Sequence, residues 1–153
     1  MNIALKMKIG DQEFTLVADM TMNVGRIYRQ KFQRDLIDDL TEIYQKLNPS
    51  IYDKIDLSGL ETDGKTEEEL TQQIINRALP VWSETRKNAV LSYTDTERAS
   101  QIIWAFVKNA DNNLPGYEEW IDSFDFLLPI KEIITALYIA WNDSAKPTVE
   151  VKN

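Results

Sequence analysis

Two pairs of carboxylates are the residues in this sequence whose types and spacing could support chemistry. Glu119 and Asp122 stand three positions apart, and so do Asp39 and Glu42. On a helix this spacing puts both side chains on one face, where their oxygens could bind Mg²⁺, a cation that prefers clustered carboxylates. Because the chain has 25 acidic residues among 153, such spacings arise by chance. We interpret both pairs as solvated helix faces.

The other reactive residue types do not form a catalytic set. The sequence has no Cys and no His, which removes the commonest general base and the usual soft metal ligands. The serines therefore have no His to activate them, and the five glycines are too scattered to form a phosphate-binding loop. Three glutamates at 67–69 follow Thr66, where acids complement the dipole at the start of a helix. We predict no catalysis, no cofactor and no metal site.

The charge balance narrows the classes of partner. The formal net charge is −8, and Lys and Arg do not gather in a run. Proteins that bind nucleic acid or anionic membranes need clustered basic residues, so we expect neither partner. The first nine residues alternate polar and apolar, unlike a signal peptide, and no apolar run is long enough to span a bilayer. The absence of Cys fits a reducing cytosol.

The hydrophobic period predicts the elements in order. Alternation over residues 2–19, with a turn at Gly10 and Asp11, predicts a β-hairpin. From Asn23 the period becomes helical, with a kink or a break into two helices near Gln33 and an end at Asn48 before Pro49. Residues 49–65 read as a long loop, which we expect to pack down in part through its apolar members, Ile51, Tyr52, Ile55, Leu57 and Leu60.

Further helices follow this loop. Thr66 with Glu69 and Thr94 with Glu97 have the spacing of capping boxes, the second before a helix over about 95–110. We expect Pro80 to be the first residue of a separate helix. A short helix over 117–124 and a last helix from Pro129 complete the pattern. The sequence thus predicts an α+β fold, an N-terminal β-hairpin packed on five or six helices, with one domain over 1–145 and a frayed tail over 146–153.

Aromatic residues are the better candidates for a functional surface. Trp82, Trp120 and Trp141 fall on core-facing stripes. Trp104 and Ile139 lie on the opposite sides of their helices from those stripes, by the rotation of about 100° per residue. Each of these two either packs on a second element, such as the hairpin, or belongs to an exposed apolar patch. We select Trp104, Ile139 and Phe126 as candidate partner-binding residues.

Several segments resemble one protein family. They are residues 25–32 (GRIYRQKF), 35–40 (DLIDDL), 102–111 (IIWAFVKNAD) and 118–124 (EEWIDSF), the last two separated by a Pro-Gly turn. Together with the opening hairpin, they resemble the tail assembly chaperones of long-tailed phages and prophages of Gram-positive bacteria. The segment 49–65 is longer than we expect for that family. The shared patterns concern packing and turns, and the family has no catalytic residues to transfer.

The resemblance implies a helper of tail morphogenesis. Such proteins bind the long tape measure protein in the host bacterial cytoplasm, keep it soluble and recruit subunits of the tail tube protein. They are absent from the mature virion, and self-association stays open. Two other classes also remain: an Mg²⁺-dependent all-α nucleotide pyrophosphohydrolase, and an acidic protein that inhibits a DNA-binding enzyme by mimicking DNA. The first lacks its full carboxylate set and phosphate-binding bases here.

Overall fold

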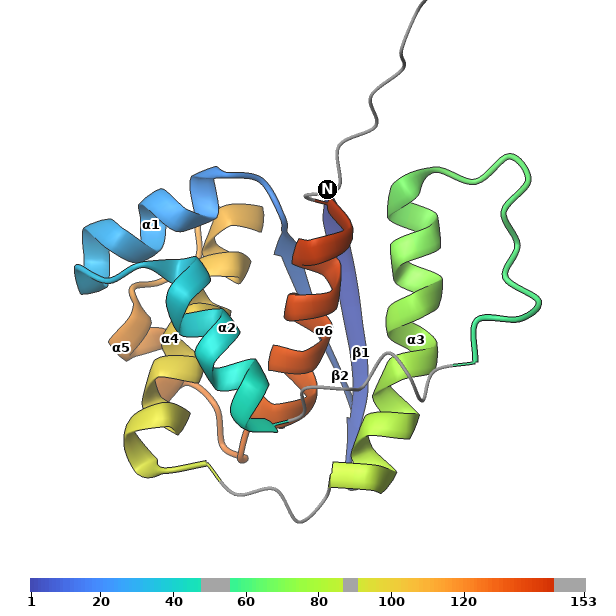
Figure 1. Cartoon of the computed structure of the whole chain (residues 1–153). Helices are drawn as coiled ribbons and strands as arrows, with labels where there is room; N and C mark the ends of the chain where they lie inside the picture. The colour runs from blue at the N-terminus through green and yellow to red at the C-terminus, as the bar shows by residue number, and fades with distance from the viewer. Residues whose placement is uncertain (48–55, 87–90, 145–153) are drawn as a thin grey trace, which may run out of the picture.

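A two-stranded hairpin and a group of helices make up the part of the chain that the computed structural model describes, residues 1–47, 56–86 and 91–144 (Figure 1). The two strands are antiparallel, and six helices follow within these residues, which confirms the predicted α+β fold. The elements are β1 (Asn2–Ile9), β2 (Gln12–Asp19), α1 (Asn23–Phe32), α2 (Leu36–Leu47), α3 (Glu67–Arg86), α4 (Tyr93–Ala110), α5 (Tyr117–Asp122) and α6 (Ile130–Ser144).

The hairpin forms as the alternation predicts. Gly10 takes a φ of +62° at the turn between Ile9 and Gln12, a conformation that costs glycine little. One face of the sheet is buried, and its core side chains are Ile3, Leu5, Leu16 and Ala18. The free edge of β1 is covered by α3, because the Gln72 amide accepts from the Ala4 N–H and donates to the Ala4 carbonyl, both at 3.0 Å.

The break between α1 and α2 falls at the predicted place. Gln33 adopts a left-handed φ of 54°, and its N–H donates to the Arg29 carbonyl at 2.8 Å, which ends α1. Asp35 then starts α2, since its carboxylate accepts from the Asp38 N–H at 3.0 Å. Two consecutive helices, rather than one kinked helix, therefore cover this stretch.

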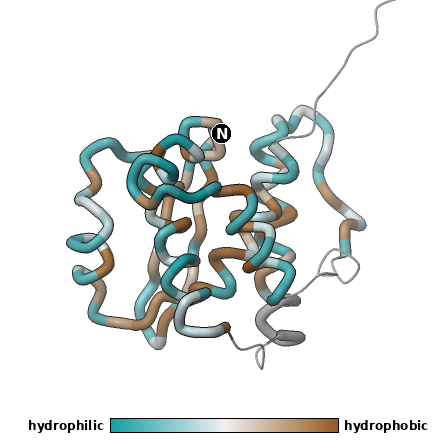
Figure 2. Tube along the Cα trace, turned by 60° about the vertical axis from the view of Figure 1, so that its left-hand side comes forward, coloured by the Kyte–Doolittle hydropathy of each residue, from teal (hydrophilic) through white to brown (hydrophobic). Residues whose placement is uncertain are grey.

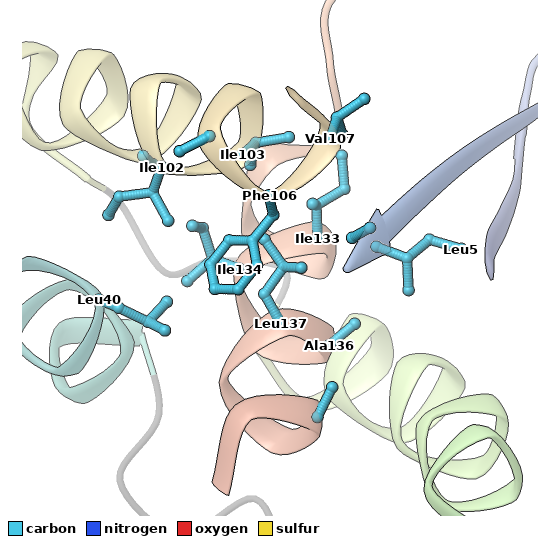
Figure 3. Close-up of a cluster of buried hydrophobic side chains, with 14 of the residues drawn as sticks. Leu5, Leu40, Ile102, Ile103, Phe106, Val107, Ile133, Ile134, Ala136 and Leu137 are labelled. Carbon is cyan, nitrogen blue, oxygen red and sulfur yellow. The ribbon is translucent and has the colours of Figure 1, made fainter. Parts of the chain in front are cut away.

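Helix α6 is the centre of the core. It lies against α3 on one side and α2 and α4 on the other, with the hairpin behind it (Figures 1 and 3). Its residues from Ile133 to Leu137 are all buried, and so are Ile139 and Ala140. Ile139 has an exposed fraction of 0%, so of its two alternatives the packing on a second element is correct and the exposed patch is wrong. Ile139 is buried although it lies opposite the apolar stripe, because α6 packs against neighbours on more than one side.

Side chains from four elements meet in this core. Figure 3 shows Phe106 of α4 directed toward Leu40 of α2 and toward α6, with Leu5 of β1 on the other side. Hydrophilic and hydrophobic stretches recur along the helical turns of the trace, as amphipathic helices require (Figure 2). Trp120 is buried as predicted, and the half-buried Trp141 packs edge-on against Phe106 at 5.9 Å between ring centroids. The side chain of Trp82 lies outside the described residues.

Two predicted helix boundaries are wrong. Pro80 does not begin a helix but lies inside α3, which runs through it to Arg86. A proline there removes one backbone hydrogen bond, yet its φ stays compatible with a helix. The cap of α4 is Ser92, whose Oγ accepts from the Asp95 N–H at 3.1 Å, two residues before the predicted Thr94. The Thr66 cap is confirmed, because its Oγ1 accepts from the Glu69 N–H at 3.2 Å.

The segment before α3 is held by polar contacts. Arg77 donates to the carbonyl oxygens of Asp56 and Ser58 at 2.8 and 2.5 Å. The Gln73 amide exchanges two hydrogen bonds with the backbone of Glu61. Leu57 is exposed and Leu60 is half-buried, so Leu57 does not pack down as predicted. Ile51, Tyr52 and Ile55 lie outside the described residues, as does the tail 146–153.

No helix in the described ranges has the length and apolar character needed to cross a membrane.

Candidate docking groove

Trp104 is a structural residue. Its side chain is 5% exposed, and its indole Nε1 donates to the Pro115 carbonyl at 3.0 Å. Its ring meets Phe32 of α1 edge-on at 5.8 Å and Tyr117 of α5 at 6.4 Å. The expectation that Trp104 is exposed is therefore wrong, and the alternative that it packs on a second element is correct. Trp104 packs on α1 and on the turn before α5. Its side of α4 is buried because α4 has neighbours on more than one side.

An open apolar hollow lies nearby, on the outer side of α4. We call it the α4–α5 groove; its volume is about 860 Å³. The start of α4, the helix α5 and the segment that joins α5 to α6 form its walls. The lining residues are Leu91, Tyr93, Thr96, Glu97, Ser100, Tyr117, Ile121, Phe124, Phe126, Leu127, Leu128, Pro129, Ile130, Lys131 and Glu132. Phe126, the third predicted partner-binding residue, is thus in the groove, whereas Trp104 and Ile139 are not.

Two large apolar side chains at this groove stand almost free in solvent. Tyr93 is 85% exposed and Leu127 is 93% exposed. Single exposed apolar residues are common on proteins, but here two of them lie at the edge of one apolar hollow. That arrangement is typical of a surface that binds another apolar surface.

An aromatic cluster supports the wall that carries Leu127. The half-buried Phe126 meets Phe14 of β2 edge-on at 5.3 Å and Phe124 at 5.5 Å. Phe124 in turn packs on the buried Trp120 at 4.9 Å. These ring contacts fix the segment between α5 and α6 to the hairpin and to α5. The groove is therefore built on packed side chains, which lowers the entropy cost of ordering the groove when a ligand binds.

Two hydroxyl groups of the groove, those of Ser100 and Tyr117, form hydrogen bonds within the protein. The Ser100 hydroxyl donates to the Glu97 carbonyl at 2.7 Å, so it accepts from the Tyr117 hydroxyl, 2.6 Å away. Burial raises the pKa of Tyr117. Both hydroxyls are thus occupied within the protein, and no base lies against Ser100 in the described contacts.

The first acid pair, Asp39 and Glu42, binds arginine side chains. Asp39 is buried, and its carboxylate accepts from the Tyr28 hydroxyl at 2.5 Å, from Arg34 Nε at 3.0 Å and from Arg98 Nη1 at 3.2 Å. Glu42 lies beside the same Arg98 at 3.4 Å. Our interpretation of this pair as a solvated face is wrong for Asp39. Its oxygens are held by protein donors, and the surrounding positive charge opposes a metal ion.

A second carboxylate extends this charged cluster. Asp95 of α4 is bound by Lys46 of α2 at 2.9 Å and by Arg98 at 2.7 Å. Hydrogen bonds from Lys46 and Arg98 lower the pKa of Asp95 to about 2. The hydrogen bond that Arg98 donates to Asp95 raises the pKa of Arg98. The cluster joins α2 to α4 by opposite charges, which is a structural role.

The second acid pair remains in solvent. Glu119 and Asp122 are both exposed on α5, as the solvated-face interpretation requires. Among the described residues, no three acidic side chains come together in a way that could hold a metal ion. The structure thus brings neither predicted pair into a metal-binding arrangement.

Sequence reasoning missed Tyr93 and Leu127. The signal that could have found Leu127 is the apolar run at 126–128 between Asp125 and Pro129, outside the helical stripes on either side. An apolar run in a connection between two helices is a candidate for exposed apolar surface. Tyr93 gives no comparable signal, because it stands alone beside Ser92 and Thr94.

Comparisons of this chain with protein-family models, with curated proteins and with solved structures gave no match.

Proposed function

We propose that this chain is a phage tail assembly chaperone, which binds and solubilises the tape measure protein and helps to recruit tail tube subunits. The observation that carries the proposal is the α4–α5 groove, an apolar hollow of about 860 Å³ edged by the exposed Tyr93 and Leu127. One of the segments that resemble this family, residues 118–124, contributes Ile121 and Phe124 to the lining of that groove.

The groove suits a helical ligand. An amphipathic helix binds by laying its apolar face into a hydrophobic groove, with anchors at every third or fourth residue. Tape measure proteins are expected to be long and rich in helices, with apolar faces that aggregate unless they are covered. Covering such a face by Tyr93, Phe126 and Leu127 would keep the partner in solution.

Charge around the groove favours a basic partner. Two acidic residues, Glu97 and Glu132, and one basic residue, Lys131, line the groove. Helix α5 also carries the exposed Glu119 and Asp122. Charges at the rim of an interface set orientation and association rate more than affinity. A tape measure helix with Lys or Arg beside its apolar stripe would meet this rim. In this proposal the protein acts in the host bacterial cytoplasm and is absent from the finished virion.

Co-expression tests the proposal. The tape measure gene of the same genome is expressed with wild-type chain, with the double variant Tyr93→Glu and Leu127→Glu, and with the double variant Val17→Glu and Leu57→Glu. Val17 and Leu57 are exposed and lie outside the groove, so their replacement is a matched control for two added surface carboxylates. We expect wild type and the Val17→Glu and Leu57→Glu variant to keep the tape measure protein in the soluble fraction and to co-purify with it. The Tyr93→Glu and Leu127→Glu variant should be folded when measured by circular dichroism. It should nevertheless leave the tape measure protein in the insoluble fraction.

Two outcomes would contradict the proposal in different ways. If wild type itself does not solubilise or co-purify with the tape measure protein, the partner is wrong. If the Tyr93→Glu and Leu127→Glu variant solubilises it as well as wild type does, the groove is wrong. A genome in which neither a tail tube gene nor a tape measure gene lies beside this gene would also count against the function.

A further inference from the structure

A second hollow, which we call the arginine pocket, has the opposite charge to the rest of the chain. It has a volume of about 320 Å³ between α1, the start of α2 and the end of α6. Its lining includes Arg26, Arg29 and Arg34, which are three of the six arginines in the sequence. The chain carries a net charge of −8, so a pocket lined by three arginines differs in charge from the chain as a whole.

Two of these arginines have no charged partner among the described residues. Arg34 is bound to Asp39 and Gln101. Arg26 and Arg29 are exposed on α1, and within the described part of the chain neither forms an ion pair or a side-chain hydrogen bond. The acid that lines the pocket, Asp35, is used to cap α2. The two guanidinium groups are therefore available to a ligand.

Apolar side chains share the pocket with these arginines. Met22 is nearly fully exposed, Ile37 is exposed, and Trp141 lines the pocket from α6. Guanidinium groups bind carboxylates through two parallel hydrogen bonds, and exposed apolar side chains gain from burial against apolar groups. A ligand that satisfies both must carry carboxylates and apolar side chains close together.

We propose that the arginine pocket docks an acidic peptide segment of a partner protein, in which Asp or Glu residues stand beside an apolar side chain. Such a segment pairs its carboxylates with Arg26 and Arg29 and places its apolar side chain against Met22 and Ile37. Nucleic acid fits less well, because its phosphates would also meet the acidic remainder of the chain. The apolar members of the pocket would gain nothing from a phosphate backbone.

The arginine pocket and the α4–α5 groove lie toward opposite ends of α6. The groove reaches Glu132 near the start of the helix, and the pocket reaches Trp141 near its end. Nine residues of helix separate these positions by about 14 Å along the axis. The pocket is thus a separate site, and its proposal does not depend on the function of the groove.

Peptide display gives an unbiased test. A library of random dodecamer peptides is selected on the purified full chain, and enriched peptides are measured by fluorescence anisotropy. The test variant is Arg26→Glu with Arg29→Glu. The matched control is Lys6→Glu with Lys8→Glu, which makes the same change in net charge at two exposed lysines of the hairpin. All variants are checked for folding by circular dichroism.

We expect enriched peptides that combine Asp or Glu with apolar residues. Their dissociation constants should rise about tenfold or more on the arginine variant, as loss of charge-assisted hydrogen bonds requires, and about twofold or less on the lysine control. Met22→Ser with Ile37→Ser should also weaken them, while Leu127→Glu should not.

Three results would overturn this proposal. One is selection of peptides without acidic residues, or of no peptide at all. Another is equal weakening by the arginine variant and the lysine control, which would indicate a general charge effect. The third is tighter binding of a labelled single-stranded oligonucleotide than of any acidic peptide, with the same dependence on Arg26 and Arg29, which would assign the pocket to nucleic acid.

Discussion

Replacing Trp104 tests whether this residue holds α4, α1 and the turn before α5 together. Trp104→Ala removes a nearly buried ring with edge-on contacts to Phe32 and Tyr117 and a hydrogen bond to Pro115. Truncation of a buried aromatic residue to Ala costs about 3–5 kcal/mol, and this range already includes lost ring contacts. The Pro115 carbonyl also loses its donor, which costs about 1 kcal/mol if water does not replace it. We expect a total loss of about 4 kcal/mol.

That loss is large beside the stability of a domain of this size. Folded domains are stable by about 5–15 kcal/mol, and each kcal/mol lowers the melting temperature by about 2–4 °C at this length. Trp104→Ala should therefore lower it by about 10 °C and shift the urea midpoint without a change in the m-value. Trp104→Phe keeps most of the ring and loses the hydrogen bond, so we expect about 1–2 kcal/mol.

The control for this experiment is an exposed aromatic residue on the same helix. Tyr93→Ala should change stability by about 0.5 kcal/mol or less, because Tyr93 stands in solvent. If Trp104→Ala costs no more than Tyr93→Ala in urea unfolding followed by circular dichroism, Trp104 does not hold these elements together. The reasoning from its contacts would then be refuted.

Three further predictions concern the core, the charged cluster and the groove. Phe106→Asp and Ile103→Asp should each prevent folding, seen as loss of the cooperative thermal transition, because an unpaired carboxylate would be buried at a fully enclosed position. The pKa of Asp95 is lowered from 3.8 to about 2, so its stabilising contribution, at most about 2 kcal/mol, is complete above pH 4 and lost as the pH falls toward 2; Asp95→Asn should flatten stability between pH 5 and pH 2 in urea titrations, and an unchanged slope would contradict this. Raising salt from about 0.1 M to about 1 M, which shortens the Debye length from about 10 Å to about 3 Å, should weaken the complex with the tape measure protein less than tenfold in co-sedimentation, because apolar contacts carry the proposed affinity.

Local signals predicted the elements well. The hairpin follows from alternation and from Gly10, which takes the positive φ that its turn needs. The break at Gln33 follows from a change of helical register, and the last helix follows from Pro129 and the stripe behind it. Local signals failed where two of them competed. Ser92 and Thr94 each begin a capping pattern, and Pro80 has the residue type of a helix start but lies inside a continuous helix.

Burial was harder to predict than secondary structure. A helical wheel separates one buried face from one exposed face, which holds only for a helix that covers a core from outside. Helices α4 and α6 each pack against several elements, so Trp104 and Ile139 are buried on the faces that the wheel assigns to solvent. The burial of Asp39 was not predicted for a related reason, because one of its three partners, Arg98, lies 59 residues away in sequence.

These corrections give the aromatic residues around α5 two linked roles. Trp104 packs on Tyr117, and Tyr117 forms part of the groove wall while its hydroxyl holds Ser100 of α4. Trp120 supports Phe124, which supports Phe126 beside the exposed Leu127. The buried rings therefore set the shape of the groove at which Tyr93 and Leu127 are exposed. Thus a residue such as Trp104 can influence partner binding through the position of α5 without touching the partner, and its variants must be compared with those of Tyr93 and Leu127 before a binding role is assigned.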